Sequence, residues 1–176
     1  MQQAPTVVPR ATMARMSEPT FSLRPAQAED LPAIVGLIRE LADFEHLSHL
    51  VRVTPESLQP HLFGPRPVAE ALVGEVQGQV VAFALFFTNF STFLGQPGLY
   101  LEDLYVQPAH RRAGLGRALL QALAALAVQR GCGRFEWSVL DWNANAIGFY
   151  ERMGAAVLPD WRICRVTGPA LKALAG

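Results

Sequence analysis

A strand that runs into a glycine-containing loop and then straight into a helix is the feature that most constrains how this chain folds. Residues 99–116 read LYLEDLYVQPAHRRAGLG, and residues 99–106 have the apolar content of a buried strand. Gly114 and Gly116 then open a helix that carries a regular stripe of leucines. The first amides of a helix have no partner inside it and carry partial positive charge. This junction therefore predicts a site for an anion such as a phosphate.

Two common nucleotide-binding motifs do not match this junction. The P-loop pattern G-x-x-x-x-G-K-[ST] is absent from the chain. A dinucleotide-binding turn requires a glycine or alanine where Leu119 stands, and residues 107–113 are too long for its tight turn. What remains is R-x-x-G-x-G, formed by Arg111, Gly114 and Gly116. On its own this pattern leaves two alternatives, a phosphate loop or a simple turn beside a solvated arginine face.

Length, charge and hydropathy narrow the class of protein. The chain has 176 residues, is 51% hydrophobic and has a formal net charge of zero, which suits one domain with a real core and argues against nucleic-acid binding. Cys132 and Cys164 lack metal-ligand spacing and are expected to be reduced thiols. The apolar run 80–87 is too short to span a membrane. We expect a disordered leader over residues 1–20, a single domain over 21–176, no metal site and a cytoplasmic location.

Hydrophobic periodicity predicts an α/β fold with one mixed central sheet. Asp30 is the expected N-cap of the first helix, and Gly154 is the expected stop after the helix that follows Asn143. The expected strands are 21–24, 68–75, 79–87, 99–106, 135–140 and 161–166, with helices over 31–44, 55–62, 114–130, 143–153 and 169–175 and a loop over 88–98.

Two segments resemble a known family. LEDLYVQPAHRRAGLGRALL, followed by WSVLDWNANAIGFYERMGA, resembles the GNAT superfamily of N-acetyltransferases, and is most similar to its diamine branch of spermidine/spermine and thialysine acetyltransferases. The likeness runs from about residue 21 to 172. It implies an acyl-CoA N-acyltransferase fold, with a mixed central sheet of about six to seven strands that is splayed in the middle and flanked by about four helices.

The resemblance implies acetyl-CoA as the acetyl-donor cosubstrate. Its pyrophosphate would lie on the amides of residues 112–117, and its pantetheine arm would enter between strands 99–106 and 135–140. Asn143 would contact the pantetheine or simply cap its helix, and both roles are compatible. The cofactor-binding residues implied by the resemblance are Leu104, Tyr105, Val106, Arg111, Arg112, Ala113, Gly114, Leu115, Gly116, Arg117, Asn143, Ala146, Tyr150 and Arg152.

Acetyl transfer to an amine requires the neutral amine. An alkylamine has a pKa near 10.4, so at pH 7 its neutral form costs about 4–5 kcal/mol to reach, and a nearby base is useful. The resemblance places Glu102 as that base, acting directly or through water, and Tyr150 as the acid toward sulfur. The plainer alternatives are a strand-surface carboxylate for Glu102 and aromatic packing beside Phe149 for Tyr150. Strand alternation puts Glu102 and Asp103 on opposite faces unless the strand bulges.

The acceptor is less constrained than the donor. Polyamine acetyltransferases of the branch carry an acid and a tryptophan where this chain has Ser91 and Phe93, so a small diamine or a lysine-like amino acid fits better than a long polyamine. The residues expected to bind the acceptor are Glu45, Phe93, Glu102 and Asp103. A protein N-terminal or lysine acetyltransferase and a non-catalytic acyl-CoA sensor remain alternatives. We expect a small-molecule amine as substrate, no nucleic-acid or membrane partner, and a homodimer.

Overall fold

The computed structural model describes residues 21–176, so the expected leader at 1–20 lies outside the described residues. The chain divides into two compact units, and the boundary between them in the sequence lies between Glu136 and Trp137. The first unit contains nearly all of the sheet and three helices, and the second contains two helices. That residues 21–176 act as a single domain remains a prediction.

A five-stranded sheet organises the first unit. Its strands follow the chain order β1-β2-β3-β4-β5, and the pairs from β1 to β4 are antiparallel. Buried apolar side chains dominate its two longest strands, where residues such as Phe83 and Leu99 are inaccessible to solvent. The strands are β1 (Ser22–Pro25), β2 (Glu70–Val76), β3 (Gln79–Ser91), β4 (Gln96–Val106) and β5 (Arg134–Trp137).

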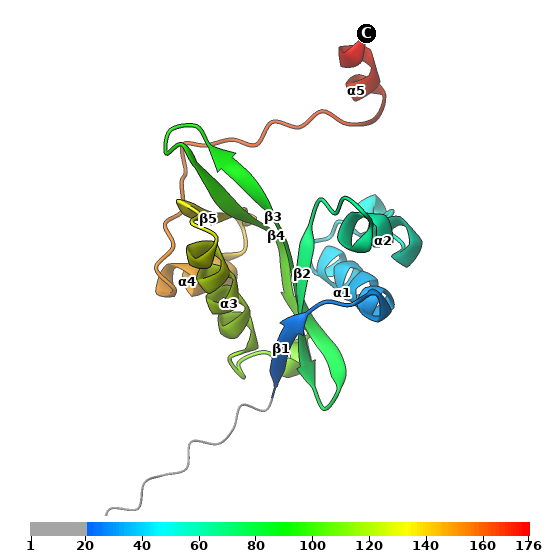
Figure 1. Ribbon diagram of the computed structural model, residues 1–176, viewed down its shortest axis with the longest axis vertical. Helices are drawn as coiled ribbons and strands as arrows, with labels where there is room; N and C mark the ends of the chain where they lie inside the picture. Colours follow the sequence, from blue (N-terminus) through cyan, green and yellow to red (C-terminus); the bar gives the residue numbers. More distant parts are fainter. Residues whose placement is uncertain (1–20) are drawn as a thin grey trace, which may run out of the picture. The chain divides into compact units, whose positions relative to one another are not determined.

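Helices cover both faces of this sheet. Figure 1 shows α1 (Leu31–Phe44) and α2 (Pro55–Phe63) on one face, and α3 (Leu115–Gln129) on the other. On the α3 face, Gly74 leaves room for Leu115, whose Cδ1 would lie only 2.9 Å from a Cβ at that glycine. The core on the α1 face is formed by Leu31, Ile34, Leu37, Leu62, Ala71, Val73, Phe83 and Tyr105.

Asp30 is the N-cap residue of α1, as expected, but only by its position. Asp30 precedes α1, but its side chain makes no capping hydrogen bond to the helix. Arg24 instead donates to both Asp30 carboxylate oxygens, at 2.6 and 2.8 Å, and also to Glu75 at 2.6 Å. The Gln27 N–H donates to the same Asp30 carboxylate at 2.8 Å. The Asp30 side chain therefore joins β1 to the start of α1, and Arg24 extends this link to Glu75 of β2.

The second unit holds α4 (Ala144–Arg152) and α5 (Gly168–Ala175). Gly154 follows α4 with a positive φ of 93°, as expected for the residue that ends a helix. The prediction of a strand at residues 161–166 is wrong, because this segment has no regular secondary structure. A strand needs a neighbouring strand to pair its N–H and C=O groups, and none pairs with this segment within residues 21–176.

Strand lengths also depart from the expectation. The loop predicted at 88–98 is mostly strand, since β3 continues to Ser91 and β4 begins at Gln96, with a short turn between them. The described residues contain five strands rather than six or seven, and five α-helices rather than about four. No helix within residues 21–176 is long and apolar enough to cross a membrane.

Candidate active site

A β-bulge in β4 places the two adjacent carboxylates. Asp103 lies opposite Leu85 of β3, whereas the next β3 residue, Phe86, lies opposite Leu101. Glu102 is therefore the extra residue of the bulge and has no register partner. A bulge bends its strand and redirects side chains, so the simple alternation expected for this strand does not hold across Glu102.

The bulge leaves Asp103 on the same sheet face as helix α1. Residues directly opposite each other in an antiparallel pair share a face, and Phe83 lies opposite Tyr105 on the face that packs against α1. Asp103 is two residues from Tyr105 and lies on that face, half-buried at the edge of the core. Helix α1 ends at Phe44, and its C-cap residue is Glu45.

Three carboxylates interact at the end of α1. Burial first, then the charges of Glu102 and Glu45, raise the pKa of Asp103 to about 6. Burial also raises the pKa of Glu45. Like charges close to a desolvated carboxyl are unfavourable unless a cation joins them. The expected acceptor residues Glu45, Glu102 and Asp103 are therefore brought together into a negatively charged site, which we call the acidic site.

The acidic site is not a metal site by geometry. Within residues 21–176, no group of three or more His, Cys, Asp or Glu side chains is arranged to hold a metal ion. The charges of Glu102 and Glu45 act on Asp103. Such an arrangement can attract an alkylammonium group, which needs negative potential but no fixed coordination geometry.

The predicted phosphate loop has the expected backbone conformation. Gly114 has a φ of 90° and is the N-cap of α3, and Arg112 also has a positive φ of 66°. The Arg111 N–H donates to the Pro108 carbonyl at 3.3 Å, and the next backbone hydrogen bond along the chain runs from the Ala118 N–H to the Gly114 carbonyl at 2.9 Å. The amides of residues 112–117 lie between these two bonds, at the positive end of the helix dipole. The loop therefore fits an anionic diphosphate.

Two further parts of the expected cofactor site lie in β4 and β5. Because β5 has four residues and β4 has eleven, β5 can pair with only part of the edge of β4. Pairing begins near the start of β4, where the Gly133 N–H donates to the Pro97 carbonyl at 2.8 Å. The edge of β4 at residues 104–106 lies beyond the reach of a four-residue strand starting there. Those groups are where a pantetheine arm could pair with the backbone.

Arg111 has protein partners that its motif does not predict. Its Nε donates to the Val106 carbonyl at 2.8 Å, and its guanidinium carbon lies 5.5 Å from the ring centre of Phe44 and 5.3 Å from that of Tyr105. Glu40 of α1 accepts a hydrogen bond from Gln107 at 2.8 Å. The sequence did not predict this contact between α1 and the loop. The sequence feature that could have indicated it is the apolar Phe44 at the end of the helical stripe.

Asn143 and Tyr150 belong to the second unit. The Ala146 N–H donates to the Asn143 Oδ1 at 3.2 Å, so Asn143 caps α4, which was one of its two expected roles. The ring of Tyr150 lies 5.1 Å from that of Trp137 and 5.4 Å from that of Phe149. Arg152, at the end of α4, is exposed.

Phe93 is the expected acceptor residue that the structure leaves apart from the other three. It lies in the turn between β3 and β4 and is 95% exposed. Leu85 and Ser91 are six residues apart, which puts this turn about 20 Å along the hairpin from the acidic site. Within the first unit, Phe93 therefore does not line the acidic site.

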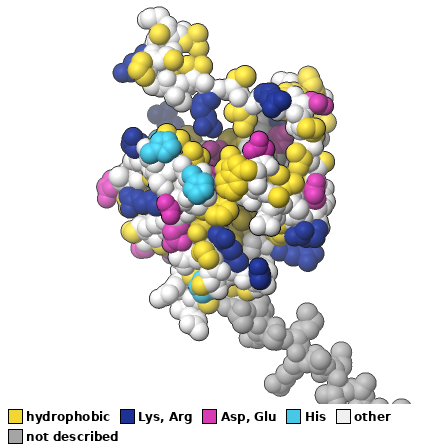
Figure 2. Space-filling model, turned by 180° about the vertical axis from the view of Figure 1, so that it is seen from behind, with side chains coloured by type: hydrophobic (Ala, Val, Ile, Leu, Met, Phe, Trp, Pro, Cys, Tyr) yellow, Lys and Arg dark blue, Asp and Glu magenta, His cyan; other side chains and the backbone are white. Residues whose placement is uncertain are grey.

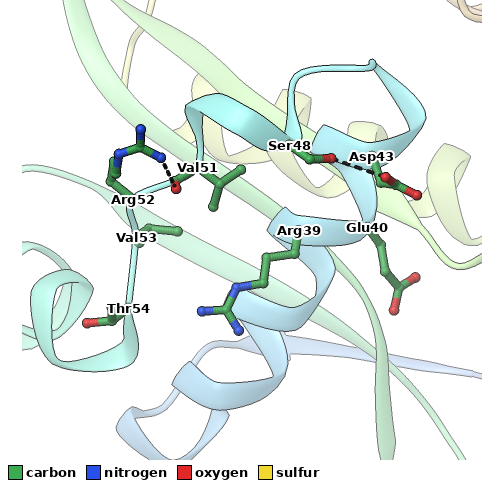
Figure 3. Close-up of a pocket in the computed structure, with 8 residues that line it drawn as sticks. All are labelled: Arg39, Glu40, Asp43, Ser48, Val51, Arg52, Val53 and Thr54. Atoms are coloured by element: carbon green, nitrogen blue, oxygen red, sulfur yellow. Dashed lines mark hydrogen bonds between the residues drawn. The ribbon is translucent and has the colours of Figure 1, made fainter.

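An open groove of about 720 Å³ lies on the outer side of α1. It runs between α1 and the segment that leads into α2, and Figure 3 shows Arg39 pointing into it while Asp43 accepts a hydrogen bond from Ser48. Arg39 and Asp43 are four residues apart and share one helix face, whereas Glu45 lies about 200° further round. None of the three carboxylates of the acidic site lines the groove.

Comparison with known proteins identifies the family. The chain matches the acetyltransferase (GNAT) family over residues 34–155. It is 36% identical to an L-ornithine N5-acetyltransferase of Arabidopsis thaliana, over 97% of this chain and 96% of that protein. It is 39% identical to a thialysine N-epsilon-acetyltransferase of Mus musculus, over 88% of this chain and 96% of that protein. The chain belongs to the GNAT family of acetyltransferases.

Solved structures share the fold at lower identity. An integron cassette protein of V. cholerae superposes with a TM-score of 0.74 and 22% identity, covering 89% of this chain and 98% of that one. An aminoglycoside acetyltransferase from an uncultured soil sample superposes with a TM-score of 0.70 and 17% identity, covering 84% and 96%. The GNAT-like α/β fold expected from the sequence is confirmed, and the protein is an acetyl-CoA-dependent amine N-acetyltransferase.

Proposed function

We propose that the acceptor is the primary amine of a small cationic molecule, a diamine or a lysine-like amino acid. The observation that carries this proposal is the acidic site of Glu45, Glu102 and Asp103, in which like charges help to raise the pKa of Asp103 to about 6. A bound ammonium would relieve this repulsion. Relatives that are named for ornithine and thialysine acetylation support an acceptor of this size.

The donor is held by the loop after β4. The amides of residues 112–117 and the exposed guanidiniums of Arg112 and Arg117 would hold the diphosphate of acetyl-CoA. The β4 backbone at residues 104–106 would pair with the pantetheine arm. We propose that four residues of the second unit also contact the cofactor: Asn143, Ala146, Tyr150 and Arg152.

The transfer that we propose is direct. Glu102 takes the proton of the acceptor ammonium, directly or through water, and the neutral nitrogen forms a bond to the thioester carbonyl carbon. The carbon–sulfur bond then breaks as the Tyr150 hydroxyl supplies a proton to the departing sulfur, and the second proton that the acylated nitrogen loses restores that hydroxyl. Asp103 and Glu45 hold the acceptor's charge. Cys132 is half-buried after the end of α3, outside the acidic site, and direct transfer requires no thiol intermediate.

The decisive experiment incubates the protein with acetyl-CoA and a panel of ornithine, thialysine, short diamines, spermidine, lysine-containing peptides and peptide N-termini. Release of free CoA thiol measures turnover, and mass spectrometry identifies the acetylated product. We expect short diamines or lysine-like amino acids to give the highest kcat/KM. Peptides as the best substrates would favour a protein acetyltransferase, and no thiol release with any amine would favour an acyl-CoA sensor. An acetylated enzyme trapped during turnover would overturn direct transfer.

We also propose that the protein acts as a homodimer. Large apolar side chains are exposed in each unit. Phe93, at the hairpin turn of the first unit, is 95% exposed. In the second unit, the segment before α5 exposes Trp161 (75%) and Ile163 (71%). Figure 2 shows apolar side chains on the surface of the terminal helix α5 as well. Exposed apolar groups of this size are typical of interfaces. Light scattering at micromolar concentration should give twice the mass of the chain, and a monomeric mass would refute this proposal.

A further inference from the structure

The arginines of the phosphate loop differ in how the protein holds them. Arg111 is engaged by the Val106 carbonyl and by two aromatic rings, one from α1 and one from β4. No hydrogen bond or ion pair within residues 21–176 holds the guanidinium of Arg112 or Arg117. Arg112 and Arg117 are therefore free to meet an anion, whereas the Nε–H of Arg111 already donates to the Val106 carbonyl and its guanidinium lies near two aromatic rings.

The contacts of Arg111 join two elements of the acidic site. Phe44 is the last residue of α1, and the next residue is Glu45, whose N–H donates to the Leu41 carbonyl at 3.0 Å. Tyr105 lies two residues after Asp103 in β4. The Arg111 guanidinium thus contacts Phe44, which precedes Glu45, and Tyr105, which lies two residues from Asp103.

A second side-chain contact also joins α1 to the residues at the end of β4. Glu40, one helical turn before Phe44, accepts a hydrogen bond from Gln107 at 2.8 Å. Burial and the charge of Glu40 raise the pKa of Tyr105, while Arg111 opposes that shift. The charges facing the Tyr105 hydroxyl are therefore Glu40 from α1 and Arg111 from the loop. Two side-chain links hold the end of α1 against the end of β4, and Arg111 is the one that also belongs to the cofactor loop.

We propose that Arg111 is a positioning residue for the acceptor rather than a ligand of the cofactor phosphates. By holding Phe44 against Tyr105 and the Val106 carbonyl, it keeps the Glu45 end of α1 at a fixed position relative to Asp103. This inference rests on the proposed function, because it takes the acidic site as the place where the cationic acceptor binds. It removes Arg111 from the residues that the sequence motif suggests for phosphate binding.

The test compares Arg111→Gln with Arg112→Gln by calorimetry with CoA and by steady-state kinetics with the best small amine. For Arg111→Gln we expect a CoA dissociation constant within about twofold of the parent, and an acceptor KM raised about three- to tenfold with little change in kcat. For Arg112→Gln we expect the reverse, a weaker CoA complex and an unchanged acceptor KM. A CoA affinity that falls equally in both variants, or an unchanged acceptor KM in Arg111→Gln, would overturn the proposal.

A second variant separates positioning from general loss of structure. Phe44→Leu keeps apolar bulk but removes the ring beneath the guanidinium. If Arg111 acts through Phe44, the double variant should raise the acceptor KM no more than the larger single effect. Additive effects on KM would contradict the proposal. A parent protein that acetylates no small amine would refute the proposed function instead, and the CoA affinities of Arg111→Gln and Arg112→Gln would still decide whether Arg111 binds phosphate.

Discussion

Asp103 lies opposite Leu85 in the β3–β4 ladder, immediately after the bulge that leaves Glu102 without a partner. This relationship puts Asp103 on the face of the sheet that α1 covers, where the charge of Glu45 reaches it. Carboxylates in this position cost stability in the empty protein. We propose that these carboxylates bind a cationic amine, whose charge offsets the cost.

Replacing Asp103 tests that cost. The pKa of Asp103 is raised to about 6, above its ordinary value near 3.9. A carboxyl with a raised pKa destabilises the fold once it ionises, so its favourable contribution is complete below about pH 4 and is lost as pH rises through about 6. Asp103→Asn should therefore gain up to about 2–3 kcal/mol of unfolding free energy at pH 8 relative to its effect at pH 4. Denaturant unfolding at both pH values measures this.

The control for that experiment is Glu151→Gln, an exposed residue in α4 of the second unit. It removes one exposed carboxylate that is not a member of the acidic site, and it serves as the control for the loss of one negative charge. The same Asp103→Asn protein should bind the acceptor more weakly. A stability difference that is equal at both pH values would show that Asp103 is not strained by its charge.

The ion-pair network at the start of α1 has the opposite pH dependence. Hydrogen bonds from Arg24 lower the pKa of Asp30. The stability that Asp30 contributes is therefore present above its unfolded pKa near 3.9 and is lost as pH falls through its lower folded value. Asp30→Asn should cost about 2 kcal/mol at pH 7, and this difference should shrink as pH falls below about 3.9. Thermal unfolding across this range measures it, and a loss that persists in acid would contradict the assignment.

Two glycine substitutions should act in opposite directions. Gly114 has a φ of 90° with no atom within 4 Å of an added Cβ, so Gly114→Ala meets backbone strain alone and should cost about 1–2 kcal/mol and weaken CoA binding. Gly36 lies inside α1, its backbone is helical, and an added Cβ there also meets nothing within 4 Å. Gly36→Ala should stabilise the protein by about 0.5–1 kcal/mol with unchanged CoA affinity. Equal effects of the two variants would contradict the left-handed assignment of Gly114.

Tyr150→Phe tests the acid. The ring packs against Trp137 and Phe149, and phenylalanine preserves this packing while removing the hydroxyl. If the hydroxyl supplies the proton to sulfur, kcat should fall tenfold or more, a rise of at least about 1.4 kcal/mol in the barrier, while acetyl-CoA still binds. Stopped assays of thiol release measure kcat, and a variant with parental turnover would remove Tyr150 from the mechanism.

Local sequence predicted the elements with the strongest periodicity. The helix expected from residue 114 begins at Leu115 with Gly114 as its cap, and the strands expected over 68–75 and 79–87 correspond to β2 and to most of β3. These features depend on neighbouring residues alone, through glycine conformation and apolar spacing. The segment at 161–166 has the same apolar character but is not a strand, since strand formation depends on a partner that periodicity does not reveal.

The sequence by itself determined the order of strand, glycine loop and helix around residues 99–116, because backbone conformation and unpaired helix amides follow from adjacent residues. Only the tertiary structure decided that Glu102 is a bulge residue, that Glu45 reaches Asp103, and that Arg111 turns toward Phe44 and Tyr105. The physical reason is that strand register, burial and charge proximity depend on residues far apart in the chain. Those distances exist only once α1 has packed on the sheet.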